Sequence, residues 1–102
     1  MKKAIQIDEL DNVATATSDV SEGETLEVIS PGGAVILRPK TLDAIPFGHK
    51  LALVDLYPGD KIMKYGEIIG VASKPIKVGA WVHTQNVESA TVPTSALRGA
   101  EP

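Results

Sequence analysis

The stretch IPFGHKLALVDLYPGDKI, residues 45–62, places an apolar run between two turn signals. Pro46 and Gly48 precede the run KLALVDL, and Pro58 and Gly59 follow it. Proline presets the φ of a turn corner, and glycine supplies the positive φ that many tight turns require. A short apolar run bounded in this way is typical of a β-strand. The stretch therefore predicts one strand between two tight turns.

The same alternation of turn signals and apolar runs extends over most of the chain. Between the glycines and prolines lie TLEVI, AVILR, KLALVDL, EIIGVAS and AWVHT. A helical hairpin would need uninterrupted amphipathic stretches of ten or more residues, and this region has none. In the first 22 residues, AIQI and NVATAT favour strands, although Leu10, Val13 and Ala14 also fit helical spacing. We predict an all-β fold of short, turn-rich strands.

A faint internal repeat runs through these turns. The pattern apolar-x-x-Gly-x-x-apolar spans Val20 to Leu26, Leu56 to Ile62 and Ile76 to Val82. Each central glycine is expected to adopt a positive φ in a tight turn before the next strand. Turn-rich β proteins also produce such matches by chance, so the repeat indicates a loop-heavy fold and not an activity.

Composition narrows the class of protein. A chain of 102 residues, 43% hydrophobic and 23% charged, is typical of one globular domain. The net charge of −3 and the scattered basic residues do not favour nucleic-acid binding. No apolar run approaches the roughly 20 residues that span a bilayer. The N-terminal MKKAIQIDEL lacks the apolar core of a signal peptide, so cytoplasm is the expected location.

The strand pattern fades near the C-terminus. The segment ESATVPTSALRGAEP is rich in small and polar residues. We therefore predict a β domain over residues 1–89 and a flexible or partner-ordered tail over residues 90–102.

Without cysteine, the candidate chemical groups are two histidines, lysines and carboxylates. His49 and His83 lie at the ends of predicted strands, where an imidazole can act as a general base, bind a metal or simply form structural hydrogen bonds. In a strand, His83 and Gln85 would share a face, but glutamine is a poor ligand for iron or zinc. Lys64, in KIMKYGEIIG, either binds an anion or is a solvated turn residue. The residues alone argue against a self-contained metal centre.

Three phrases carry a family resemblance. LDNVATATSDVSEGE, IPFGHKLALVDLYPGDKIMKYGEIIG and IKVGAWVHTQNVES occur in this order between residues 10 and 89. They resemble the N-terminal SAF-type β-clip domain of the altronate and galactarate dehydratase family, with its pattern D-N-V-A, G-H-K-x-A-L, K-Y-G-x-x-I-G and V-H-x-H-N. In that family the domain usually precedes a larger one that carries most of the active site. Some members are split into small and large subunits, as in the sulfo-lyase that acts on sulfolactate.

The resemblance implies a function for the chain. It would be the small subunit of an iron-dependent lyase that removes water or sulfite from a hydroxy acid such as altronate, galactarate or sulfolactate. The partner would be a large catalytic subunit that holds most of the Fe2+ site. The motifs do not choose among these acids, and association with further copies of the chain is also compatible with them.

The resemblance also implies site residues. The catalytic residues would be His49, Lys64 and His83, with His49 and His83 as potential metal ligands. The substrate-binding residues would be Asp11, Asn12, Lys50, Tyr65 and Asn86. The second imidazole of V-H-x-H-N is replaced by Gln85, which weakens the expectation of a two-histidine ligand pair on this strand.

Two alternatives stay open. SAF-type domains also occur in binding and assembly proteins that catalyse nothing. The chain could also be a structural subunit of a lyase, in which the histidines only pack against the catalytic partner.

Overall fold

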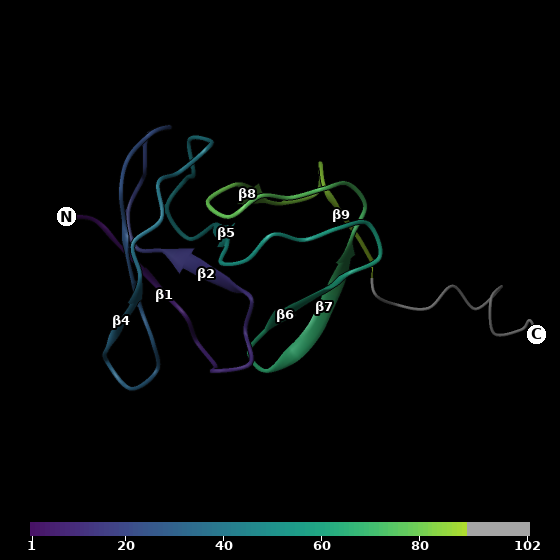
Figure 1. The fold of residues 1–102 in the computed structure, drawn as a ribbon, viewed down its shortest axis with the longest axis horizontal. Coiled ribbons are helices and arrows are strands. Elements are labelled where there is room, and N and C mark those ends of the chain that lie inside the picture. The colour runs from purple at the N-terminus through teal and green to yellow at the C-terminus, as the bar shows by residue number, and fades with distance from the viewer. Residues whose placement is uncertain (90–102) are drawn as a thin grey trace, which may run out of the picture.

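A computed structural model describes residues 1–89 and shows nine short strands there and no helix (Figure 1). The strands are β1 (Lys3–Ile5), β2 (Val13–Ala16), β3 (Glu27–Ile29), β4 (Val35–Leu37), β5 (Lys50–Ala52), β6 (Lys61–Lys64), β7 (Glu67–Ala72), β8 (Trp81–Val82) and β9 (Val87–Glu88). The all-β prediction is confirmed, and β1 and β2 confirm the strand interpretation of the first 22 residues. The predicted tail, residues 90–102, lies outside the described residues.

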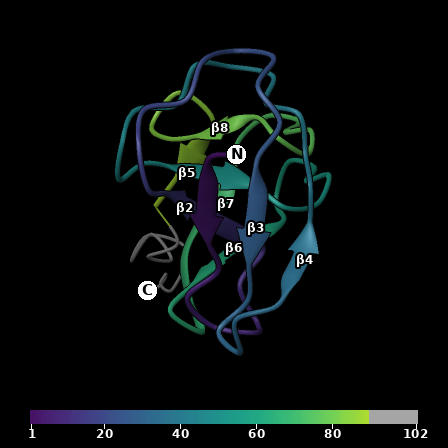
Figure 2. The same ribbon diagram turned by 90° about the vertical axis from the view of Figure 1, so that its left-hand side faces the viewer.

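The strands form two sheets. One has six strands in the order β4-β3-β1-β2-β5-β8, and the other has three in the order β6-β7-β9. In Figure 1, β1, β2 and β4 lie on the left and β6, β7 and β9 on the right, with β5 and β8 between them. Figure 2 shows β3 and β4 side by side at the edge of the larger sheet. Over the described part of the chain, no helix is long and apolar enough to span a membrane.

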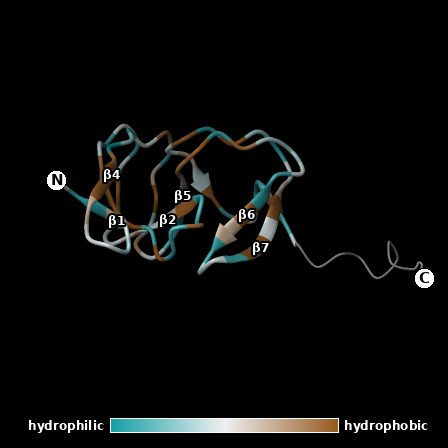
Figure 3. Cartoon of the chain, turned by 60° about the horizontal axis from the view of Figure 1, so that its bottom comes forward, coloured by the Kyte–Doolittle hydropathy of each residue, from teal (hydrophilic) through white to brown (hydrophobic). Residues whose placement is uncertain are grey.

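The hydrophobic core has two parts, and β5 contributes to both. Leu51 belongs to the first cluster with Ala4, Ala14, Ala16, Val20, Leu26, Val28, Ile45 and Leu53. Ala52 belongs to the second with Val13, Leu56, Ile62, Ala72, Ile76 and Val82. Successive residues of a strand face opposite sides, so one short strand can join two cores. Some apolar side chains stay outside both clusters, such as the exposed Ile36 in β4 and Ile68 in β7. Figure 3 shows brown in β4 and in parts of β7.

The turn pattern occurs four times, once more than the sequence predicted. The missed copy runs from Ile45 through Gly48 to Leu51. All four glycines have a positive φ, namely 82° at Gly23, 83° at Gly48, 94° at Gly59 and 88° at Gly79. The predicted positive φ is therefore confirmed at Gly23, Gly59 and Gly79, and Gly48 shares it.

The four turns associate in two pairs. Val20 and Ile45 exchange two backbone hydrogen bonds of 2.9 and 2.8 Å, and Leu56 and Ile76 exchange two of 2.7 and 2.8 Å. Each turn glycine donates its N–H to a carbonyl that precedes the partner turn. The donors and acceptors are Gly23 to Thr41, Gly48 to Ala16, Gly59 to Ala72 and Gly79 to Ala52. Every turn is thus completed by another turn from a different part of the chain.

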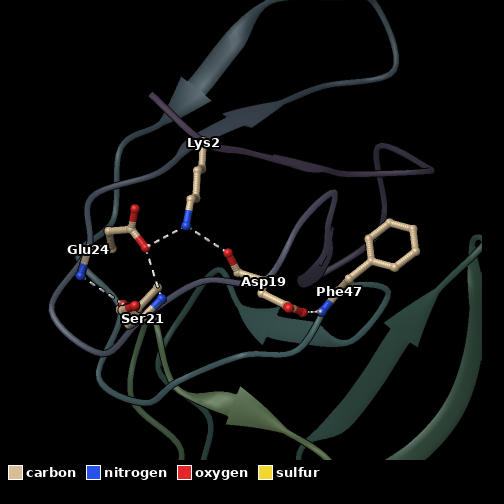
Figure 4. A network of polar contacts seen from close by, with 6 residues as sticks. Lys2, Asp19, Ser21, Glu24 and Phe47 are labelled. Carbon is tan, nitrogen blue, oxygen red and sulfur yellow. Dashed lines mark hydrogen bonds and ion pairs between the residues drawn. The ribbon is translucent and has the colours of Figure 1, made fainter.

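A carboxylate fixes each pair in an equivalent way. Asp19 Oδ1 accepts a 2.8 Å hydrogen bond from the N–H of Phe47, and Asp55 Oδ1 accepts one of 3.0 Å from the N–H of Val78. Figure 4 shows the first of these contacts, and beside it Lys2, whose Nζ donates to the carbonyl of Asp19 and to Glu24. The paired turns hold the ends of β5 and β8 in place, and the candidate site lies there.

Candidate functional site

Two histidines and a tryptophan meet at one end of the β5–β8 pair. The register sets Leu51 opposite Trp81 and Lys50 opposite Val82. The ring centroids of His49 and His83 lie 4.9 Å apart with the rings at 65°. Trp81 stacks on His83 at 5.2 Å and 7°, and meets the His49 ring edge-on at 5.5 Å. The structure therefore brings the two sequence-predicted histidines into one cluster.

Trp81 is the member of this cluster that the sequence interpretation did not assign to the site. Its signal was the spacing W-V-H, because residues two apart on a strand share a face. The indole packs against the first core cluster, and its Nε1–H is buried with no hydrogen-bond partner among the described residues. Trp81 therefore joins the imidazoles to the rigid part of the domain.

Asn86 holds the turn that carries His83. Its Oδ1 accepts a 3.0 Å bond from the His83 N–H, and its Nδ2 donates a 2.8 Å bond to the Trp81 carbonyl. The prediction that His83 and Gln85 share a strand face is wrong, because β8 ends at Val82 and residues 83–86 form a turn. Gln85 instead donates to the Trp81 carbonyl at 3.1 Å. Asn86, predicted to bind substrate, makes these contacts with the backbone.

Asp11 lies buried at the tip of the β6–β7 hairpin. Its carboxylate accepts hydrogen bonds from the N–H groups of Gly66 at 2.8 Å, Tyr65 at 3.1 Å and Asp8 at 3.0 Å. Tyr65 has a φ of 58°, which side chains rarely adopt, and Gly66 has a φ of 74°. The carboxylate therefore holds a strained two-residue turn by its N–H groups.

Asn12 attaches the same hairpin to the six-stranded sheet. Its Oδ1 accepts a 2.8 Å bond from the Met63 N–H, and its Nδ2 donates a 2.8 Å bond to the Lys61 carbonyl. Asp11 and Asn12 were both predicted to bind substrate. In the structure, the contacts of these two side chains are to the backbone of this chain, where they fix the hairpin.

Lys50 follows His49 directly in the chain, and the charge of Lys64 reaches Lys50. Lys50 begins β5 and is half-buried, and both its burial and the nearby charge of Lys64 lower its pKa. Lys64 ends β6, and its Nζ lies 4.9 Å from the centroid of the exposed Tyr65 ring, in a cation–π contact. Within residues 1–89, neither lysine forms an ion pair.

A groove of about 290 Å³ adjoins this cluster. It is lined by Lys50, Ile69, His83, Thr84, Val87, Glu88 and Ser89. The groove thus lies between β5 and the smaller sheet, and Lys50 and His83 both line it. A second hollow of about 400 Å³ lies by the Val20–Ile45 turn pair, and Trp81 is one of its lining residues.

The histidines do not make a complete metal site. Across the described part of the chain, no group of three or more His, Asp or Glu side chains is placed to hold a metal ion. A catalytic metal generally takes three protein ligands, so His49 and His83 fit two positions at most. The remaining ligands would have to come from outside these residues.

The fold and the cluster define the chain as a small all-β domain that presents two imidazoles and an ammonium group at the β5–β8 pair. Its residues 2–90 match the family model described as the altronate/galactarate dehydratase SAF domain. The chain belongs to this family, as the sequence phrases predicted, and its relatives are dehydratases and a sulfo-lyase.

Three relatives illustrate the likeness. Altronate dehydratase of Bacillus subtilis is 38% identical over 89 residues, which cover 87% of this chain and 17% of that protein. Galactarate dehydratase (L-threo-forming) of Escherichia coli is 35% identical over 78 residues, 76% of this chain and 14% of that protein. The (2R)-sulfolactate sulfo-lyase subunit alpha of Chromohalobacter salexigens is 45% identical over 53 residues, 52% of this chain and 56% of that subunit. The chain spans less than a fifth of the two dehydratases.

Proposed function

We propose that the chain works as the small subunit of a lyase that eliminates water or sulfite from a small hydroxy acid in the cytoplasm. The observation that carries the proposal is the 4.9 Å separation of the His49 and His83 rings, since these residues occupy the G-H-K and V-H motifs of the family. A likeness to a subunit alpha in two sulfolactate sulfo-lyases, at 45% and 47% identity, supports the two-subunit arrangement.

Proton transfer is the chemistry that such a pair suits. In the elimination, a base removes a proton from the carbon beside the carboxylate, a carbon–carbon double bond forms, and the hydroxyl on the next carbon leaves as water after an acid protonates it. For a sulfonated acid, the carbon–sulfur bond breaks instead and sulfite leaves with the electron pair. Imidazoles are the commonest groups for both proton transfers near neutral pH. We assign this work to His49 and His83, and we assign to Lys64 the stabilisation of negative charge.

The family also implies Fe2+, which would act as a Lewis acid on the departing oxygen. The described residues supply two imidazoles at most, so we propose that the large catalytic subunit holds most of the iron site. No step assigned to this chain depends on the metal.

The test is an assay of the assembled enzyme. The chain is co-expressed with a candidate large subunit, and the purified complex is assayed with altronate, galactarate and (2R)-sulfolactate in the presence of Fe2+. We expect His49→Ala to lower kcat by at least about 100-fold and His83→Ala to lower it in part, as is usual for acid–base groups. Neither variant should change co-purification with the large subunit. Full turnover in His49→Ala would refute the assignment.

A structural role is the second candidate. The stacking of Trp81 on His83 and its edge contact with His49 favour it, because rings held in this way also build rigid interface surfaces. Under this alternative, the two alanine variants lose affinity for the large subunit, and those complexes that form turn over at the normal rate.

A further inference from the structure

Lys50 is a half-buried cation without a counter-charge among residues 1–89. Lys2, Lys3, Arg38 and Lys77 each form an ion pair with a glutamate or aspartate. Lys50 is less exposed than these surface residues, and within residues 1–89 it has no such partner. Holding an ammonium partly out of water without an anion is unfavourable. This arrangement is what a site for a negatively charged ligand requires.

The groove beside Lys50 suits a small ligand. Its volume of about 290 Å³ lies at the lower end for ligand pockets, which begin at roughly 300 Å³. Ile69 and Val87 give it apolar walls, while the His83 imidazole and the Thr84 hydroxyl can hydrogen-bond to a bound molecule. A dinucleotide or a peptide helix would be too large.

The charges around the groove favour an anion. Glu88 lines the groove as its one carboxylate among the described residues, and it forms no ion pair with Lys50. Lys64 adds a second positive charge from the β6–β7 hairpin, whose tip Asp11 and Asn12 fix by hydrogen bonds. Both cations are thus carried by elements that the fold holds in place.

We propose that Lys50 anchors the anionic group of the substrate, a carboxylate or sulfonate, in this groove, and that the hydroxyl-bearing carbons lie toward Thr84 and His83. The inference rests on the proposed function and specifies which group of the substrate Lys50 binds, and in which groove. An anion beside Lys50 would also oppose the lowering of its pKa by burial and by Lys64. The anchor and the proton-transfer groups would then occupy separate parts of one site.

The anchor can be tested on the 102-residue chain without its partner. Sodium acetate and sodium methanesulfonate are titrated separately into the isotope-labelled chain, and NMR follows the amide signals of Ile69 and Thr84 and the side-chain signals of Lys50. Sodium chloride at equal ionic strength is the reference. We expect saturable shifts with a millimolar Kd, as is usual for such small probes. The probe with the lower Kd identifies the preferred anionic group.

Lys50→Met is the informative variant, because methionine keeps most of the apolar stem and removes the charge. Lys40→Met is the matched control, since the Lys40 side chain lies beside Gly23 and does not line the groove. Saturation should be lost in Lys50→Met and kept in Lys40→Met. Shifts that merely follow ionic strength, or saturation that persists in Lys50→Met, would overturn the proposal.

Kinetics of the assembled enzyme separate the anchor from the proposed function. Lys50→Met should raise KM about tenfold or more with a much smaller change in kcat, the pattern of an interaction made equally in the bound and transition states. Saturable anion binding without turnover of any of the three acids would leave the anchor standing and contradict the proposed function. Turnover with an unchanged KM in Lys50→Met would contradict the anchor alone.

Discussion

The imidazole rings of His49 and His83 lie 4.9 Å apart although they come from different turns of the chain. The antiparallel pairing of β5 with β8 brings them together, and the Trp81 indole holds them there through ring contacts with both. A two-histidine site is thus assembled from a G-H-K turn and a W-V-H strand end. Four predictions about stability and activity follow from the contacts at Trp81, Asp11, the turn glycines and Lys50.

Replacing Trp81 with alanine should release both histidines. The indole packs against the first core cluster, so its loss should cost about 3 kcal/mol of unfolding free energy. Trp81→Phe keeps an aromatic face over His83 and should cost less. Urea denaturation measures the stability, and lyase activity of the complex measures the orientation of the imidazoles. Tyr57→Ala, at an exposed aromatic residue, is the control and should change stability by about 0.5 kcal/mol or less.

Replacing Asp11 with alanine should leave three backbone N–H groups without their carboxylate acceptor. We expect a loss of roughly 3 kcal/mol, because unsatisfied buried donors are costly and the hairpin tip is strained. Asp60 offers a comparison, since its carboxylate accepts one hydrogen bond, from the Tyr57 N–H, and is exposed. Asp60→Ala should therefore cost about 1 kcal/mol. Equal losses in the two variants, measured by chemical denaturation, would contradict the role assigned to Asp11.

The turn glycines should differ in their tolerance of a side chain. At Gly79 a Cβ would clash with the Lys40 carbonyl oxygen, whereas at Gly59 it would meet nothing within 4 Å. Both have a positive φ, so Gly59→Ala should cost about 1–2 kcal/mol for the backbone alone. Gly79→Ala adds the steric clash and should cost at least about 3 kcal/mol. Thermal unfolding followed by circular dichroism would show whether this order holds.

The stability of the chain should depend on pH through Lys50. Burial and the charge of Lys64 lower its pKa from the ordinary 10.5, so just below pH 10.5 the unfolded chain binds more protons at this residue than the folded chain does. The contribution of Lys50 to the free energy of unfolding is therefore lowest below its lowered pKa. This contribution increases as the pH rises from the lowered pKa toward 10.5.

Lys50→Met should remove this dependence. The Lys50→Met variant should have a higher free energy of unfolding than the natural chain near neutral pH, and this difference should shrink toward pH 10.5. Denaturation at a series of pH values measures it. An advantage of Lys50→Met that did not change with pH would show that its cause is not the charge.

Local features could be predicted from the sequence. The short apolar runs and the turn glycines depend on neighbouring residues, and three of the four positive-φ turns follow from them. The fourth was not recognised, although Ile45, Gly48 and Leu51 fit the same pattern. The family could also be predicted, because its motifs are contiguous phrases.

Contacts between distant segments could not be predicted. Two of the three hydrogen bonds that Asp11 accepts come from residues 54 and 55 positions further along the chain, and the sequence around Asp11 does not predict them. The strand alternation applied to Gln85 was wrong because Asn86 closes a turn directly after Val82. Trp81 reaches the site because β8 pairs with β5 in the register that sets Trp81 opposite Leu51.

The pairing of turns also bears on how the chain folds. The Val20 turn is completed only when the Ile45 turn arrives, and the Leu56 turn only when the Ile76 turn does. Closing such loops costs chain entropy before any contact stabilises the product, and topologies of this kind fold in milliseconds to seconds rather than microseconds. During synthesis, the first turn of each pair must therefore wait for the second turn of that pair to leave the ribosome, and until then its apolar residues are exposed to aggregation.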